Sequence, residues 1–250
     1  MHWFRRRARR RVGILLPWLV AASCAGAGEE PAEWRARIDD PARCAEAVEE
    51  LAAMGGDAID LLIALLAEPS GAPPLVAAEL LGTLGEEAAP AIPALLHALR
   101  AGEPGVRGIC AITLGRIGEA AASPAIGPLL EATSDVDHRV RVAAAIGYCG
   151  VTGDRVRMLP LVVDGALSAE RAVRFLALDA CRVIGEPALA ILTTRLASPD
   201  ATLRAAAARA LGELGPGARS ARQAIYDLLK DGDPEVRAAA EAALDQLREG

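Results

Sequence analysis

The sequence contains few aromatic residues, and this shortage narrows the folds that it can support. Phenylalanine, tryptophan and tyrosine together make up 3% of the 250 residues. Because β-strands favour aromatic and β-branched side chains, this composition fits sheets poorly. Hydrophobic residues nevertheless make up 52% of the chain, and most of them are alanine and leucine. Such a composition is typical of closely packed helices.

Histidine is equally scarce, and the common catalytic motifs are missing. The three histidines are His2, His97 and His138, and none lies in an HExxH motif. The sequence contains no Walker loop, no GxSxG motif, no EF-hand loop and no CxxC pair. Each of these spacings would place reactive or metal-binding groups within reach of one another. We therefore predict a chain without catalytic residues, without a cofactor and without a metal ligand.

What the sequence does contain is a phrase of about ten residues that recurs every 30 to 35 residues. A period of this size is typical of stacked supersecondary units. Four of the copies have a glycine three residues beyond the end of the phrase: Gly118, Gly150, Gly185 and Gly215. The five copies run from Val106-Arg107 to Leu114-Gly115, from His138-Arg139 to Ile146-Gly147, from Val173-Arg174 to Cys181-Arg182, from Leu203-Arg204 to Leu211-Gly212, and from Val236-Arg237 to Leu244.

Each repeat is expected to form two helices, because apolar residues recur at steps of three and four within it. The fold class predicted from this pattern is all-α, an α-solenoid of about six helix pairs and a closing helix over residues 41–250. The first helices are expected near 41–53, 73–84, 104–117, 136–149, 169–184, 200–213 and 234–248, and the second helices near 57–67, 88–100, 122–133, 154–166, 186–197 and 218–230.

Residues 1–23 have the order of an export signal, and residues 24–40 are expected to be a tether. Six arginines precede an apolar run from Val12 to Ala22, which is too short to span a bilayer. Two cleavage sites remain open: a lipobox that would leave Cys24 lipidated, and the small residues Ala25-Gly26-Ala27. Either site predicts an exported protein, in the periplasm or membrane-anchored as a bacterial lipoprotein.

The charge of the chain bears on its partners. The formal net charge is −6, and removal of residues 1–23, with six arginines and no acid, takes it to −12. Nucleic-acid binding requires concentrated lysine and arginine, so an acidic body disfavours it. We predict another protein as the partner, no nucleic acid, and membrane contact only through a lipid on Cys24.

The recurrent arginine of the phrase has two interpretations, as a ligand site or as a structural element. An acid precedes each arginine, and a guanidinium can donate to the carbonyls or carboxylates of the preceding turn. We favour the structural role for this set, which consists of Arg107, Arg139, Arg174, Arg204 and Arg237. Four cysteines, Cys44, Cys110, Cys149 and Cys181, lie at apolar helical positions and are expected to be buried free thiols.

One position near the end of each second helix varies while its neighbours do not. It is acidic in the centre of the chain and basic towards the carboxyl terminus. These side chains are expected to line the inner face of the solenoid, where such proteins commonly bind peptides or helices. The alternative is an ordinary solvated surface. The candidate partner-binding residues are His97, Glu131, Asp164, Arg195 and Lys230, in register with Ala67.

The phrase, with Asp233-Pro234 before its last copy, resembles HEAT repeats, in particular the short type called the phycobilisome-lyase HEAT-like repeat. The resemblance covers about residues 41–250 and implies a scaffold or adaptor. Some members of this class are bilin lyase subunits, and one relative is a di-iron hydroxylase of deoxyhypusine that uses His-Glu pairs. None of the three histidines here precedes a glutamate. We expect a non-enzymatic, protein-binding scaffold of the cell envelope; the alternative is a lyase-type enzyme or enzyme subunit that holds a substrate for covalent modification.

Overall fold

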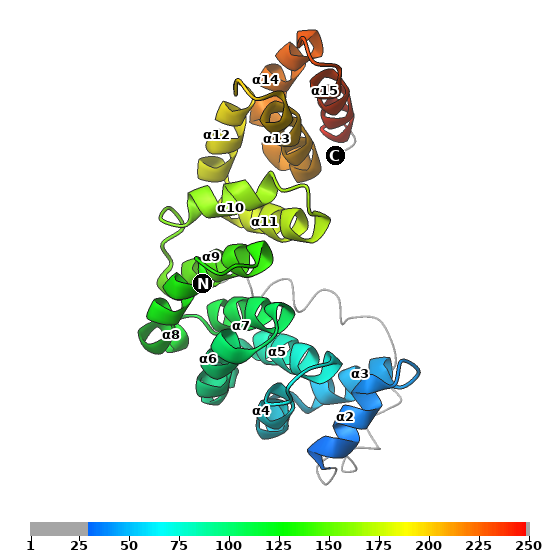
Figure 1. Ribbon diagram of the computed structural model, residues 1–250, viewed down its shortest axis with the longest axis vertical. Coiled ribbons are helices and arrows are strands. Elements are labelled where there is room, and N and C mark those ends of the chain that lie inside the picture. Colours follow the sequence, from blue (N-terminus) through cyan, green and yellow to red (C-terminus); the bar gives the residue numbers. More distant parts are fainter. Residues whose placement is uncertain (1–29, 249–250) are drawn as a thin grey trace. The chain divides into compact units, whose positions relative to one another are not determined.

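The computed structural model describes residues 30–248, and every regular element in this range is a helix (Figure 1). The α-helices are α2 (Pro31–Asp39), α3 (Cys44–Met54), α4 (Ile59–Leu66), α5 (Ala72–Leu84), α6 (Ile92–Ala101), α7 (Pro104–Ile117), α8 (Glu119–Ala132), α9 (His138–Thr152), α10 (Leu159–Ala166), α11 (Arg171–Ile184), α12 (Glu186–Arg195), α13 (Ala201–Leu214), α14 (Arg222–Asp227) and α15 (Pro234–Gln246). Short 3₁₀ helices are η2 (Gly55–Ala58), η3 (Gly85–Ala91), η4 (Gly215–Ala221) and η5 (Leu228–Lys230).

These helices alternate between the first and second members of successive pairs, as the period predicts. The first helices are α3, α5, α7, α9, α11 and α13, and α15 closes the chain. The second helices are α4, α6, α8, α10, α12 and α14, and three of them begin with a 3₁₀ segment. The fold prediction, an all-α solenoid of paired helices, is therefore confirmed.

The chain divides into two compact units. The described residues up to Ala132, with Gly150–Thr152, form the first unit. The second unit consists of Thr133–Cys149 and the described residues from Gly153 onward. Most of helix α9 therefore belongs to the second unit, and its last turn belongs to the first.

In the first unit, the first helices α5 and α7 pack side by side (Figure 1). Ala77, Ala78 and Ala111 are fully or almost fully buried, so the two backbones approach closely. The hydroxyl of Thr113 in α7 donates a buried hydrogen bond of 2.8 Å to the carbonyl oxygen of Ala78 in α5. Adjacent repeats are thus joined by both apolar packing and a polar contact.

Helix α2 lies within the segment predicted to be a tether. Its Trp34 has no exposed surface and its Ile38 is 2% exposed. The helix packs against α3, α4 and α5, and Arg37 stacks on the Trp34 ring while pairing with Glu50 at 2.7 Å. A predicted tether over 24–40 therefore needs correction for residues 31–39, because one large aromatic side chain and one isoleucine supply enough buried surface to dock this short helix.

In the second unit, α13 packs against α15, and a glycine makes their close approach possible. A Cβ atom on Gly212 of α13 would lie 2.7 Å from the Cα atom of Ala243 in α15. Ala207, Ala208 and Ala210 of α13 are fully buried. Side chains larger than alanine at these positions would separate the two helices.

A glycine with positive φ ends most of the first helices. Gly118, Gly185 and Gly215 have φ of 76°, 76° and 63°, as expected for the glycines that follow the phrase. Gly150 is the exception, because the positive φ in that repeat belongs to Gly153, at 71°. Only glycine adopts this backbone region without strain, so these residues fix where the chain turns from a first helix to a second.

The start of α9 explains why the glycine with positive φ in this repeat is Gly153 and not Gly150. The amino-terminal cap of α9 is Asp137, so His138 and Arg139 occupy the first two positions of the helix. In α7, α11, α13 and α15 the phrase begins three residues after the cap, and in α9 that position belongs to Val140. Val140 is fully buried, as Val173 and Val236 are, whereas His138 is only half-buried. The phrase of this repeat therefore starts at Val140-Arg141.

The predictions for residues 1–23 and for a lipid on Cys24 lie outside the described residues. Across residues 30–248, none of the helices is both long and apolar enough to traverse a bilayer.

Candidate functional site: the turn arginines and the row on the second helices

In α7, α9, α11, α13 and α15, the arginine four residues after the amino-terminal cap binds the turn that enters its helix. Its Nη1 group donates to backbone carbonyls five or six residues earlier. In α13, Arg204 donates to Ser198 at 2.9 Å and to Pro199 at 3.1 Å. In α15, Arg237 donates to Asp231 at 2.7 Å and to Gly232 at 3.0 Å. We call this set the turn arginines: Arg107, Arg141, Arg174, Arg204 and Arg237.

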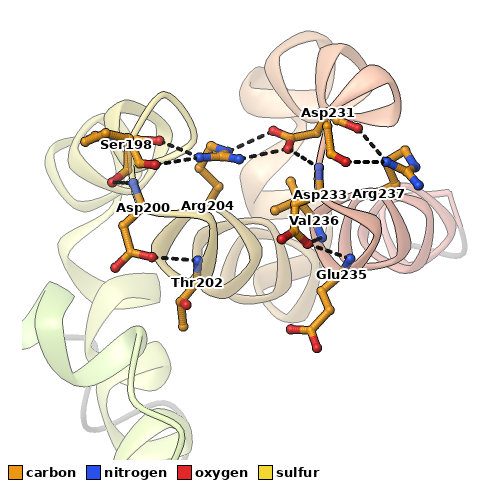
Figure 2. A network of polar contacts seen from close by, with 11 residues as sticks. Ser198, Asp200, Thr202, Arg204, Asp231, Asp233, Glu235, Val236 and Arg237 are labelled. Carbon is orange, nitrogen blue, oxygen red and sulfur yellow. Dashed lines mark hydrogen bonds and ion pairs between the residues drawn. The ribbon is translucent and has the colours of Figure 1, made fainter.

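Two successive copies of this turn are visible in Figure 2, and they share a second feature. The side chain two residues before the cap accepts a hydrogen bond from the backbone N–H of the cap residue. Ser198 does so for Asp200 at 3.2 Å, and Asp231 does so for Asp233 at 2.9 Å. Asp200 and Asp233 in turn accept from the first N–H groups of their helices. These contacts satisfy donors that a helix start would otherwise leave unpaired.

Two turn arginines also join one repeat to the next. Arg174 Nε lies 3.2 Å from Glu213 Oε1 of α13, and Arg204 pairs with Asp231 through two contacts of 2.8 Å. The hydrogen bonds from Arg204 hold the pKa of Asp231 below its ordinary value of 3.8. A guanidinium that donates to carbonyls with one nitrogen and to a carboxylate with others uses the planar geometry that lysine lacks. These two arginines thus contact both the turn that precedes their own helix and the repeat that follows it.

Arg139 does not belong to this set, which corrects its assignment from the sequence. Its side chain pairs with its own cap, Asp137, at 3.1 Å and lies 3.5 Å from Glu170. Arg141 instead donates to the carbonyls of Asp135 and Val136, at 2.8 and 3.1 Å. The sequence contained a signal for this: Val140-Arg141 matches the start of the phrase better than His138-Arg139 does.

The variable positions of the second helices are a separate set of residues. His97, Glu131, Asp164, Arg195 and Lys230 are all exposed, and so is Ala67. His97, Glu131 and Asp164 lie in α6, α8 and α10, Arg195 is the last residue of α12, and Lys230 ends η5. We call these positions the second-helix row. Within the first unit it contains Ala67, His97 and Glu131, and within the second it contains Asp164, Arg195 and Lys230.

Two carboxylates of the second-helix row lie where helix stability disfavours them. The carboxyl end of a helix carries partial negative charge, so an acid there is unfavourable and a cation is favourable. Glu131 and Asp164 lie in the last turns of α8 and α10, and neither helix has a basic residue in that turn. Asp164 has one weak contact, 4.0 Å from Arg195, with both side chains about half exposed. Helix stability therefore does not account for these two acids.

The cysteines lie on first helices, as the pattern predicts, and three of them are poor nucleophiles. Burial raises the pKa of the Cys110 and Cys181 thiols to about 12 and that of Cys149 to about 11. Cys110 and Cys181 are buried, whereas Cys44 and Cys149 are partly exposed, and all four are free thiols. A thiolate is the reactive form, so these pKa values leave almost none at neutral pH. Within residues 30–248, no three His, Cys, Asp or Glu side chains gather in a group that could hold a metal ion.

The chain belongs to the HEAT-repeat family. The family model for HEAT repeats matches residues 59–147, 123–212 and 191–249. A search of curated proteins found no match. The family accounts for the paired helices, and it carries no assignment of the second-helix row.

Three solved structures have a similar fold. YibA of Escherichia coli is 15% identical, with a TM-score of 0.49, over 90% of this chain and 94% of that one. The complex of CpcE and CpcF of phycocyanin lyase from Nostoc sp. is 18% identical, with a TM-score of 0.43, over 94% and 99%. Human deoxyhypusine hydroxylase is 21% identical, with a TM-score of 0.42, over 88% and 97%.

Proposed function

We propose that this protein is a non-enzymatic scaffold or adaptor of the bacterial cell envelope that binds another protein through the second-helix row. The observation that carries the proposal is the exposure of Glu131 and Asp164 at the carboxyl ends of their helices. Each placement costs helix stability, on the order of 0.3–1 kcal/mol at a surface site. Binding to a partner supplies a reason for retaining acids at these positions.

The turn arginines and the second-helix row have different contacts, and this difference supports the proposal. The turn arginines and their carboxylates are occupied by contacts within the chain, for example between Arg204 and Asp231. The side chains of the second-helix row are exposed and differ from repeat to repeat. In a solenoid, a surface of this kind can change its partner without altering the interfaces that stabilise the stack.

The envelope part of the proposal comes from residues 1–23 and Cys24. Export would place the repeats outside the cytoplasm, and a lipid on Cys24 would attach them to a membrane. Metabolic labelling with palmitate tests this directly: the wild-type chain should incorporate the label, and Cys24→Ser should not. Incorporation that persists in Cys24→Ser, or its absence from the wild-type chain, would contradict lipidation at this residue.

Capture of partners from a native envelope extract tests the role of the row. The double variant Glu131→Lys/Asp164→Lys should recover partner at least about tenfold less well than wild type, as expected when a buried charge pair is broken at an interface. The matched control is Glu79→Lys/Glu241→Lys, which reverses the charge of two exposed acids on first helices, one in each unit. Equal recovery by all three proteins would refute the assignment of the row.

A further inference from the structure

The last second helix differs from the others in its charge. The segment formed by η4, α14 and η5 contains three basic residues, Arg219, Arg222 and Lys230, and one acid, Asp227. The earlier second helices are acidic or balanced: Asp57 and Asp60 precede or begin α4, and Glu119 and Glu131 are the only charged residues of α8. A positive segment in a chain of net charge −6 is a local feature that the overall composition does not predict.

The three cations and one aromatic residue recur at steps of three or four residues along this segment. Arg222 and Tyr226 lie four residues apart in α14, on adjacent turns of the helix, and Lys230 follows four residues later at the end of η5. Arg219 lies one turn before Arg222. All four residues are exposed, and Tyr226 is 53% exposed. We call these four residues the basic stripe.

The cations of the basic stripe make no ion pair or hydrogen bond with other side chains in residues 30–248. Elsewhere in the same unit, arginines are used within the chain: Arg174 pairs with Glu213 and Arg204 with Asp231. The one acid of the segment, Asp227, accepts a hydrogen bond of 3.0 Å from Gln223 instead. Three exposed positive charges therefore lie beside a tyrosine without internal partners.

We propose that the basic stripe binds a short acidic peptide segment of the partner protein. This inference rests on the proposed function and names the chemistry of the bound segment. With the rise of about 1.5 Å per residue in α14 and about 2.0 Å in the 3₁₀ helices η4 and η5, Arg219 and Lys230 lie roughly 16 to 20 Å apart along the axis. An extended peptide covers that distance with about five or six residues, at about 3.3 Å per residue. Carboxylates of the peptide would pair with the guanidinium groups, and Tyr226 would supply an apolar surface and a hydroxyl group.

The size of the basic stripe favours a peptide over other anionic partners. Membrane-binding segments usually cluster about four to eight lysines and arginines, and the stripe has three basic residues. Stable nucleic-acid binding uses about six to ten phosphate contacts. The next second helices along the row also place Asp164 beside Arg195, which would repel a long polyanion that continues past the stripe. A short acidic segment meets neither difficulty.

Fluorescence anisotropy with a labelled peptide of five glutamates tests the proposal. At low salt the wild-type protein should bind this peptide, and Arg219→Glu/Arg222→Glu should weaken binding at least about tenfold. Tyr226→Ala should weaken it several-fold. The control Arg171→Glu/Arg209→Glu changes the net charge equally by reversing two other exposed arginines of the same unit, and it should bind as wild type does.

A covalent readout locates the contact, because Lys230 is the only lysine of the chain. A carbodiimide should join a carboxylate of the bound peptide to the Lys230 amine as an amide, with the water lost taken up by the carbodiimide. Mass spectrometry should find the peptide attached at Lys230, and the attachment should disappear in Arg219→Glu/Arg222→Glu. Attachment confined to the amino terminus would overturn the proposal.

Two further outcomes would also overturn it: tighter binding to phosphatidylglycerol vesicles or to oligothymidylate than to the peptide at the same salt concentration. Failure here is distinguishable from failure of the proposed function. If the partner depends on Glu131 and Asp164 but the peptide does not bind, the scaffold role stands and the basic stripe is excluded as its acidic-peptide site. If the peptide binds at the basic stripe while the Glu131 and Asp164 variants retain the partner, the row assignment fails and the stripe remains.

Discussion

At the residue scale, the side chain of a turn arginine can make several stabilising contacts at once. Arg204 satisfies the carbonyls of Ser198 and Pro199 and the carboxylate of Asp231, which itself holds the N–H of Asp233. Figure 2 shows that this chain of contacts runs from one helix start to the next. Because Asp231 accepts hydrogen bonds both from Arg204 and from the N–H of Asp233, its ionisation is coupled to the stability of the fold.

This coupling predicts a specific pH dependence. The folded-state pKa of Asp231 is lowered, so its ionised form stabilises the fold above its ordinary pKa of 3.8, and the contribution is lost as pH falls through the lower folded value. Asp231→Asn, which keeps an oxygen for the Asp233 N–H, should therefore unfold at a lower temperature than wild type near pH 7. The difference between the two unfolding temperatures should become smaller below about pH 4. Thermal unfolding from pH 7 to pH 3 measures it, with Glu241→Gln as the control; a gap that stays constant would contradict the account.

The raised pKa values of three thiols make a second prediction. In a chain with Cys24→Ser and Cys44→Ser, the buried Cys110 and Cys181 should react with an aromatic disulfide reagent at pH 8 only as fast as the protein opens. The partly exposed Cys149 should react slowly, because its raised pKa leaves little thiolate. All three should react at once in denaturant. Rapid reaction of any of them in the folded protein would conflict with pKa values of about 11 to 12. It would instead support the alternative function, a lyase that uses a cysteine nucleophile.

At the element scale, the glycine that ends a first helix determines where the second begins. Gly185 has φ of 76° and ψ of −135°, and its N–H donates to the carbonyl of Cys181 at 2.8 Å. Gly215 and Gly118 have nearly the same backbone angles. A side chain at these positions is strained even where space is available around it.

Alanine substitutions should therefore have opposite effects at two glycines. Gly185→Ala should lower the free energy of unfolding by about 1–3 kcal/mol through backbone strain. Gly127→Ala lies inside α8, where an added Cβ would meet nothing within 4 Å, and should raise it by up to about 1 kcal/mol through helix propensity. Urea unfolding of both variants checks the pair. A shift in the same direction for both would argue against the assigned backbone conformation of Gly185.

The paired helices of the repeats could be predicted from the sequence because apolar spacing reports burial directly. Less could be predicted where two patterns compete. In α9, the positions of Gly147 and Gly150 indicate a phrase that starts at His138. In the structure Asp137 caps the helix and Val140 is fully buried, so the phrase starts two residues later. Helix α2 was missed because its packing depends mainly on Trp34, and one aromatic residue gives no period. The 3₁₀ starts of three second helices also leave no periodic signal.

At the scale of the whole molecule, the sequence separates residues that stabilise the stack from residues that are exposed and variable. Exposure of the second-helix row was expected from the repeat, and every member is exposed. The sequence indicates a basic carboxyl-terminal end, and the structure adds which charges are available: Arg174 and Arg204 are used internally, whereas Arg219 and Arg222 are exposed. The repeated phrase contains the first two arginines and predicts their structural role, but it gives no information on Arg219 and Arg222, which lie outside it.

Carboxyl footprinting of the protein with and without its captured partner tests the central claim most directly. Labelling of exposed acids by a carbodiimide and an amine nucleophile reports which carboxylates a partner covers. We predict that the partner reduces labelling of Glu131 and Asp164 and leaves Glu79 and Glu241, on first helices, unchanged. Protection of Glu79 and Glu241 with full labelling of Glu131 and Asp164 would contradict the account.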